Sequence, residues 1–151
     1  MQITTTRFGE VEIDENLIFT FVQPIIGYDK LSRYVLIEHN ENSAFKWLQS
    51  VDEPSLAFPV TSPAFFNIDY QFEIPTETAE QIELTSVDSL ISLNVVTIPQ
   101  GKPQKATINL LAPIIINANN KQGMQMILSN SNYPVKYSLF GNKADEQTNQ
   151  G

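Results

Sequence analysis

Apolar residues along the chain fall in short runs that are rich in β-branched and aromatic side chains, with turn-forming residues between them. Runs of this kind are typical of strands, because such side chains pack well on a pleated surface. The expected strands are residues 11–13, 17–22, 34–37, 45–48, 56–60, 69–74, 90–98, 106–111, 114–116 and 124–128. Roughly ten short strands with frequent turns predict one all-β barrel or sandwich with minor α.

One helix is expected over residues 76–84. Thr78 and Gln81 have the spacing of a capping box, in which each side chain hydrogen-bonds a free backbone N–H of the first helical turn. Ala79 and Ile82 fall on one side of this helix. We therefore expect the short helix to cover an open end of the barrel.

A second helical turn is expected at Ser62 and Pro63, since serine suits the N-cap and proline suits the first helical position. Residues 1–140 hold all of these elements and are expected to form a single barrel domain. Residues 141–151 lack apolar anchors. The sequence therefore predicts a disordered C-terminal tail.

Length and composition exclude several classes of protein. The chain has 151 residues and no cysteine, so disulfides, thiolate catalysis and sulfur-ligated metal sites are ruled out. No apolar run approaches the roughly 18 residues of a membrane-spanning helix, and the first residues do not resemble a signal peptide. We expect a cytoplasmic protein with no membrane partner.

Charge is unevenly distributed along the chain. Residues 1–88 contain fifteen acids and four bases, whereas residues 89–144 contain five bases and no acid. The acids either line solvated edges and turns or form an acidic face that attracts a basic protein. The net charge of −8 argues against nucleic acid as a direct partner, because phosphate binding needs clustered lysine and arginine.

Candidate chemistry is sparse. His39 is the sole histidine and lies in a polar segment, where a solvated loop side chain is expected rather than a catalytic base or metal ligand. The neighbouring acids Asp52 and Glu53 precede Pro54 in a turn, so they are not expected to converge on a substrate. We therefore expect no catalytic residue, no metal site and no cofactor. A small-molecule-binding barrel and, less favoured, a carboxylate-based hydrolase remain as alternatives.

Three blocks stand out in order along the chain: residues 48–54 (LQSVDEP), 56–60 (LAFPV) and 107–117 (TINLLAPIIIN). They resemble motifs of the FliW family of flagellar assembly factors, and the third block is the most distinctive. Residues 21–29 (FVQPIIGYD) match the opening block in part, because Pro24 and Ile26 stand where the family has glycine and proline. The order and spacing of these blocks extend over most of the chain.

The resemblance implies an antiparallel pseudo-barrel capped by a helix, in a non-enzymatic cytoplasmic regulator. Family members bind flagellin before export, and they also bind the translational repressor CsrA. Freed from flagellin, the family member removes CsrA from the flagellin message, so the level of flagellin controls its translation. The sequence does not indicate whether the chain self-associates.

The resemblance also directs attention to particular surfaces. The sticky helical end of flagellin would need an apolar groove, for which the candidates are Phe58, Phe65, Phe66 and Tyr70. For contact with CsrA we expect Asp69, Tyr70 and Glu73 with neighbouring Phe58, because they combine charge with aromatic surface. Four polar residues of the motifs are instead expected to satisfy buried backbone groups. These are Gln49, Ser50, Asn109 and Asn117.

Overall fold

The computed structural model describes residues 1–38 and 43–140. His39 and the predicted tail at 141–151 lie outside the described residues. The described residues form eleven strands, one α-helix and four short 3₁₀ helices. The strands are β1 (Gln2–Thr5), β2 (Gly9–Glu12), β3 (Phe19–Phe21), β4 (Arg33–Ile37), β5 (Lys46–Ser50), β6 (Ala57–Thr61), β7 (Leu90–Thr97), β8 (Thr107–Ile108), β9 (Ile114–Asn117), β10 (Gln122–Gln125) and β11 (Tyr137–Ser138). The helices are η1 (Glu15–Leu17), η2 (Pro63–Phe66), α1 (Thr76–Gln81), η3 (Val87–Ser89) and η4 (Pro103–Lys105).

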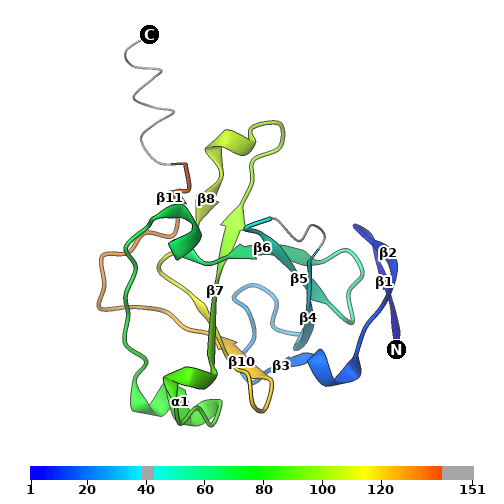
Figure 1. Cartoon of the computed structure of the whole chain (residues 1–151), viewed down its shortest axis with the longest axis horizontal. Helices are drawn as coiled ribbons and strands as arrows, with labels where there is room; N and C mark the ends of the chain where they lie inside the picture. Colours follow the sequence, from blue (N-terminus) through cyan, green and yellow to red (C-terminus); the bar gives the residue numbers. More distant parts are fainter. Residues whose placement is uncertain (39–42, 141–151) are drawn as a thin grey trace.

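Seven of these strands close into a barrel (Figure 1). Their order is β7-β6-β5-β4-β3-β10-β9, and pairing of β9 with β7 completes the circle. Strand β7 is the longest and continues beyond β9 to pair with β8, which in turn pairs with β11. The prediction of an all-β barrel with a short helix is confirmed.

One pair of barrel strands is parallel. Thr20 of β3 lies beside Gln122 of β10, and Phe21 lies beside Gly123. The other barrel neighbours are antiparallel, as the resemblance implies. A Cβ atom on Gly123 would lie 2.9 Å from Ile116 Cγ1, so the absence of a side chain lets β10 pack closely against the core.

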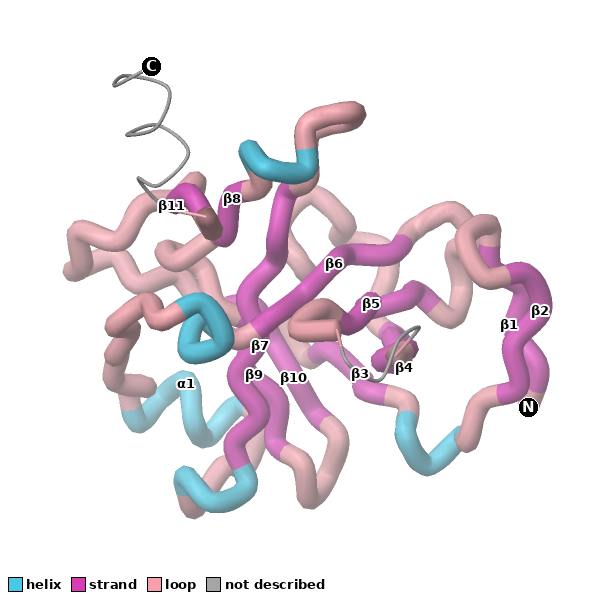
Figure 2. The backbone as a smooth tube through the Cα atoms, turned by 45° about the horizontal axis from the view of Figure 1, so that its top comes forward, coloured by secondary structure: helices cyan, strands magenta, loops and turns pink. Residues whose placement is uncertain are grey.

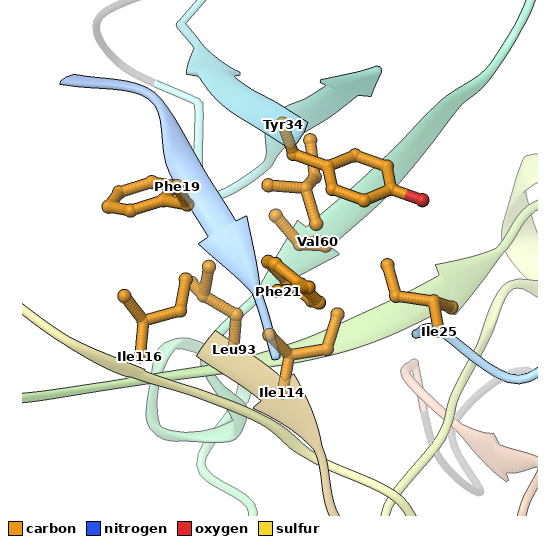
Figure 3. Close-up of a cluster of buried hydrophobic side chains, with 9 residues drawn as sticks. Phe19, Phe21, Ile25, Tyr34, Val60, Leu93, Ile114 and Ile116 are labelled. Atoms are coloured by element: carbon orange, nitrogen blue, oxygen red, sulfur yellow. The ribbon is translucent and has the colours of Figure 1, made fainter. Parts of the chain in front are cut away.

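The barrel interior is filled with large apolar side chains (Figure 3). Strands β3, β4, β7 and β9 contribute from different sides, and the Phe21 and Tyr34 rings have centroids 5.0 Å apart. The burial of this cluster is the main source of stability for the barrel. Its buried members are Phe19, Phe21, Ile25, Tyr34, Leu48, Val60, Leu93, Ile114 and Ile116.

Strands β1 and β2 form a separate hairpin beside the barrel, at the right of Figure 2. Ile3 of β1 and Ile13 are buried against Val35 of β4, which fixes the hairpin to the outer face of the sheet. The Arg7 guanidinium lies 3.9 Å from the centre of the Trp47 ring, a cation–π distance. The sequence predicted a strand at 11–13 but did not predict β1.

Helix α1 differs from its prediction in its end and in its cap. It begins at Thr76 with Pro75 as N-cap and has no side-chain cap, so the predicted capping box at Thr78 is wrong. Ile82, just after the helix, is fully buried against Ile115 and Met124. Since Ile114 and Ile116 belong to the interior cluster and Ile115 does not, Ile82 packs on the outer side of β9.

Two further expectations are corrected. Residues 69–74 are extended, but they pair with no described strand and thus form no sheet element. The turn predicted at Ser62 and Pro63 exists as η2, whereas Ser62 makes no side-chain cap bond. Asn67 ends η2 in the left-handed conformation at φ 57°, which an asparagine tolerates better than most residues.

Candidate protein-binding surface

The connection between η2 and β7 lies on the outside of the barrel and carries unbalanced charge. We call residues 67–89 the strap; it is drawn in green in Figure 1. It contains six acids and no lysine or arginine. Every one of the six is exposed: Asp69, Glu73, Glu77, Glu80, Glu83 and Asp88. The acidic excess of the first 88 residues is therefore concentrated in part on one solvent-facing segment.

The strap borders an open groove of about 870 Å³. Its lining includes residues 70–74, the segment 84–87 that follows α1, and Leu90 and Ser92 of β7. Apolar residues, including Phe72, Ile74, Leu84 and Val87, make up much of the lining. We call this feature the strap groove. Its mixture of apolar lining and acidic rim is typical of surfaces that bind proteins.

Tyr70 fixes the wall of the strap groove. Its hydroxyl donates to the Leu110 carbonyl oxygen at 2.7 Å, and its ring packs on Phe72 and Tyr133 at centroid distances of 5.3 and 4.7 Å. Burial raises the pKa of Tyr70 to about 12, although hydrogen bonding with Asn94 acts in the opposite direction. Tyr133 also donates to the Gln71 carbonyl oxygen at 2.9 Å. The extended segment is thus held by side chains instead of a neighbouring strand.

Five of the predicted contact residues belong to or flank the strap. Tyr70 and Glu73 line the strap groove, while Asp69 is exposed between them and η2. Phe65 has 70% of its surface exposed, whereas Phe66 packs on Phe45 with ring centroids 5.5 Å apart. Of these adjacent rings, one is therefore exposed and the other is packed against the protein.

Phe58 does not join the other predicted residues. It is half-buried in β6, packs on Tyr28 at 5.1 Å between ring centroids, and lines a different hollow of about 350 Å³. Three exposed aliphatic side chains surround that hollow: Ile26 (59%), Ile127 (54%) and Val135 (52%). We call this hollow the apolar pocket. Of the six predicted residues, Tyr70 and Glu73 therefore line the strap groove and Phe58 lines the apolar pocket.

The loop that carries Ile26 is held in place by Gln125. The Ile26 N–H donates to Gln125 Oε1 at 2.9 Å, and Gln125 Nε2 donates to the Ala112 carbonyl oxygen at 3.2 Å. Gly27 follows with φ 93°, a conformation that disfavours other residues. The apolar pocket is formed by six segments far apart in sequence, and its three exposed aliphatic side chains come from three of them. Sequence reasoning missed its exposed members because nothing in a short apolar run shows which side chain faces solvent.

The two surfaces adjoin each other. A shallower hollow of about 330 Å³ is lined by Phe72 and Glu73 of the strap and also by Ile127 of the apolar pocket. Large partners on the two surfaces would therefore come into contact.

The polar motif residues serve the backbone, as predicted. Gln49 Nε2 donates to the carbonyl oxygens of Ser50 (3.1 Å) and Leu56 (3.0 Å). Asn109 Oδ1 accepts the N–H groups of Leu111 and Ala112, both at 3.0 Å. Ser50 Oγ likewise accepts two N–H groups of the following turn, and Asn117 joins two segments. These side chains are thus engaged in holding the fold.

The acid pair at Asp52 and Glu53 does not form a catalytic arrangement. Asp52 makes a bidentate ion pair with Arg33, and the Arg33 Nε lies 3.1 Å from Asp52 Oδ2. The Arg33 guanidinium lowers the pKa of Asp52, the reverse of what a general acid requires. Among residues 1–38 and 43–140, no three His, Asp or Glu side chains are grouped as a metal site would require. The same residues contain no helix long and apolar enough to cross a membrane.

Comparison with known proteins identifies the family. A family model described as FliW protein matches residues 2–139. The chain belongs to the FliW family. A flagellar assembly factor FliW of Thermotoga sp. (strain RQ2) is 40% identical over 134 residues, which cover 89% of this chain and 90% of the relative. The flagellar assembly factor FliW of Natranaerobius thermophilus is 36% identical over 143 residues, 95% of each chain.

The fold agrees with this membership. A crystal structure of the flagellar assembly factor FliW superimposes with a TM-score of 0.86 at 34% identity, over 95% of this chain and 99% of that one. The resemblance read from residues 48–60 and 107–117 is therefore confirmed, as is the barrel that it implied. The strap, the strap groove and the apolar pocket are features of a FliW fold.

Proposed function

We propose that this FliW-family chain is a non-enzymatic flagellar assembly factor of the cytoplasm that binds flagellin and the translational repressor CsrA. Binding to CsrA would relieve repression of the flagellin message, and flagellin would compete for the same chain. The observation that carries the proposal is the pair of adjoining surface hollows on the outside of a filled barrel. One surface is acidic and the other is apolar.

The strap supports CsrA as one partner. A repressor that binds RNA needs a basic surface, and the six exposed acids of the strap would attract it. Asp69 and Glu73 are the charged contacts that we propose, with Tyr70 as the aromatic one and exposed Phe65 beside them. Antagonism would then rest on electrostatic attraction followed by burial of the strap groove.

The apolar pocket supports flagellin as the other partner. A sticky helical segment binds by placing its apolar face in a hydrophobic groove. Ile26, Ile127 and Val135 are each more than half exposed and surround Phe58, and such a cluster is uncommon on a surface with no partner. Because this pocket adjoins the strap groove, two bound proteins would exclude each other sterically.

The alternatives have less support. A small-molecule-binding barrel needs space inside, whereas the interior here is occupied by a cluster of buried aromatic and aliphatic side chains. The hollows described above open to the outside of the barrel. A carboxylate hydrolase needs two converging acids, and Asp52 is instead paired with Arg33.

Titration calorimetry with purified CsrA and purified flagellin tests the proposal. We expect saturable binding of each partner alone, and loss or weakening of the second titration when the first partner is already bound. If neither protein binds, the proposed function is wrong. If both bind without affecting each other, the competition is wrong.

A matched pair of variants tests the apolar pocket. Ile127→Ser should weaken flagellin binding about fivefold or more, the loss of a contact worth about 1 kcal/mol. Leu17→Ser changes an aliphatic residue of similar exposure, 53%, in η1 and should leave the affinity unchanged. Equal affinities of the two variants would remove Ile127 from the flagellin contact.

A further inference from the structure

Strand β7 has one edge that is not fully used. On one side it pairs with β9 from Leu90 to Leu93 and then with β8. On the other side β6 pairs with Asn94 and Val95. Strand β6 ends there, because the chain turns into η2 at Pro63. The first half of β7 therefore has no strand on its β6 side within the part of the chain that the structure describes.

The direction of the free peptide groups follows from the hydrogen bonds of β7. Ala118 N–H donates to the Ser89 carbonyl oxygen at 2.8 Å, and Asn109 N–H donates to the Val95 carbonyl oxygen at 2.9 Å. In an antiparallel strand the N–H and C=O of one residue point to the same edge, and those of the next residue point to the opposite edge. Odd-numbered residues of β7 thus face β9 and β8, and even-numbered residues face the other edge.

Two residues expose peptide groups on that edge. The Leu90 N–H donates to the Val87 carbonyl oxygen at the end of η3. The Leu90 carbonyl and both the N–H and the C=O of Ser92 have no hydrogen-bond partner in the described chain on this side. These three groups are the unpaired edge of β7. An unpaired edge is a template for adding a strand.

The strap groove lies directly on this edge, since Leu90 and Ser92 both line it. Its opposite wall is the extended segment 70–74, in which half-buried residues alternate with exposed ones. An extended peptide in the groove would therefore lie between two extended segments, where β6 would continue if Pro63 did not end it. The apolar lining would receive every second side chain of that peptide.

We propose that the strap groove binds an extended basic segment of a partner protein, which adds to the unpaired edge of β7 as an extra strand. The Ser92 N–H would donate to the segment, while the Ser92 and Leu90 carbonyl oxygens would accept its N–H groups. The charge of the segment follows from the strap, whose six acids are all exposed and unaccompanied by lysine or arginine. The bound segment should alternate apolar and basic residues, because its apolar side chains would face the lining of the groove and its basic side chains the acidic rim.

The inference deepens the proposed function, because it gives the binding mode of the basic partner. It predicts backbone pairing in addition to the charge attraction already described. Backbone pairing is insensitive to which side chain Ser92 carries but requires its N–H. A proline at this position removes the N–H on the unpaired edge without touching the ladder to β9.

The first experiment uses a short fluorescent peptide of alternating lysine and valine, measured by anisotropy. We expect saturable binding that weakens with salt, no binding of an alternating glutamate–valine peptide, and no binding of the lysine–valine peptide with methylated backbone nitrogens. Exchange of the Ser92 amide hydrogen should slow when the peptide is bound. Equal binding of the methylated peptide, or unchanged exchange at Ser92, would overturn the proposal.

The second experiment compares Ser92→Pro with Ser92→Ala, which keeps the N–H. Proline should lower affinity for the peptide about five- to tenfold relative to alanine, as expected for one lost hydrogen bond. Equal affinities in two folded variants would overturn the proposal. If Ser92→Pro does not fold, the methylated peptide and the amide exchange still decide the question.

Titration of the same variants with CsrA separates the two proposals. CsrA binding that is equal in Ser92→Pro and Ser92→Ala would overturn the added strand and leave the proposed function standing. Peptide binding that depends on the Ser92 N–H, with no binding of CsrA, would support the added strand and overturn the proposed partner.

Discussion

The Asn117 side chain connects β9 to the residues that follow α1: its Nδ2 donates to the Ile82 carbonyl oxygen at 2.9 Å and to that of Glu83 at 3.1 Å. Its Oδ1 accepts the Asn119 N–H at 3.0 Å. Glu83 has φ 53°, so the chain reverses there at the point where Asn117 holds it. One motif residue thereby connects the barrel to the surface that we propose binds partners.

Asn117→Ala should lower the free energy of unfolding by about 1–3 kcal/mol, because the backbone groups it serves lose their partner. Urea denaturation measures the loss. Asn132→Ala, at an exposed asparagine, is the control and should change stability by less than about 0.5 kcal/mol. Equal stability of the two variants would show that Asn117 is dispensable to the fold.

Ile115→Ala should lower the free energy of unfolding by about 2–5 kcal/mol, because a fully buried side chain leaves a cavity. Ile115 packs with Ile82 and Met124, so the loss should also loosen the strap. Ile98→Ala, with 42% of the parent residue exposed, is the matched control in the same denaturation experiment. A negligible loss at Ile115 would contradict its burial.

Glu73→Lys should weaken CsrA binding while the melting temperature stays nearly constant, because Glu73 is exposed on the wall of the strap groove. Glu10→Lys makes the same charge change on the β1–β2 hairpin, and we expect less effect there. Calorimetry at low and high salt checks both. Equal affinity of Glu73→Lys and the parent would remove Glu73 from the interface.

Tyr70→Phe should destabilise the protein by about 0.5–1.5 kcal/mol at neutral pH through loss of the hydrogen bond to Leu110. Burial raises the Tyr70 pKa from 10.0 to about 12, so the folded state favours the neutral phenol. That stabilisation is fully present below pH 10 and is lost as the pH rises from 10 toward 12. The stability difference between parent and variant should therefore stay constant up to about pH 10 and shrink as the pH rises toward 12. A constant difference would contradict the pKa shift.

Much of the fold could be read from the sequence because strands carry a local signal. The apolar runs at 34–37, 56–60 and 114–116 each lie within or overlap an observed strand. The run at 106–111 shortens to β8, since Asn109 uses its side chain to turn the chain at Leu111 and Ala112. The helix was located and begins at Thr76 as expected, but it ends at Gln81, and the predicted capping box is absent because Pro75 occupies the N-cap position.

Alternation alone did not distinguish a strand from an extended segment. Residues 69–74 alternate because Tyr70, Phe72 and Ile74 pack inward while Asp69, Gln71 and Glu73 face solvent. A sheet needs a hydrogen-bonded neighbour as well, and the hydroxyl of Tyr133 takes that place at Gln71.

The sequence by itself determined the class of fold, the family and the acidic character of the strap, because periodicity, motif spacing and charge are local properties of the chain. Only the tertiary structure decided that Phe58 lies apart from Glu73 and that Ile26, Ile127 and Val135 form one surface. It also decided that Ser92 stands on an unpaired edge. These relationships depend on how the barrel closes: β9 pairs with β7, and β6 ends before it reaches the first half of β7. No run of neighbouring residues encodes that closure.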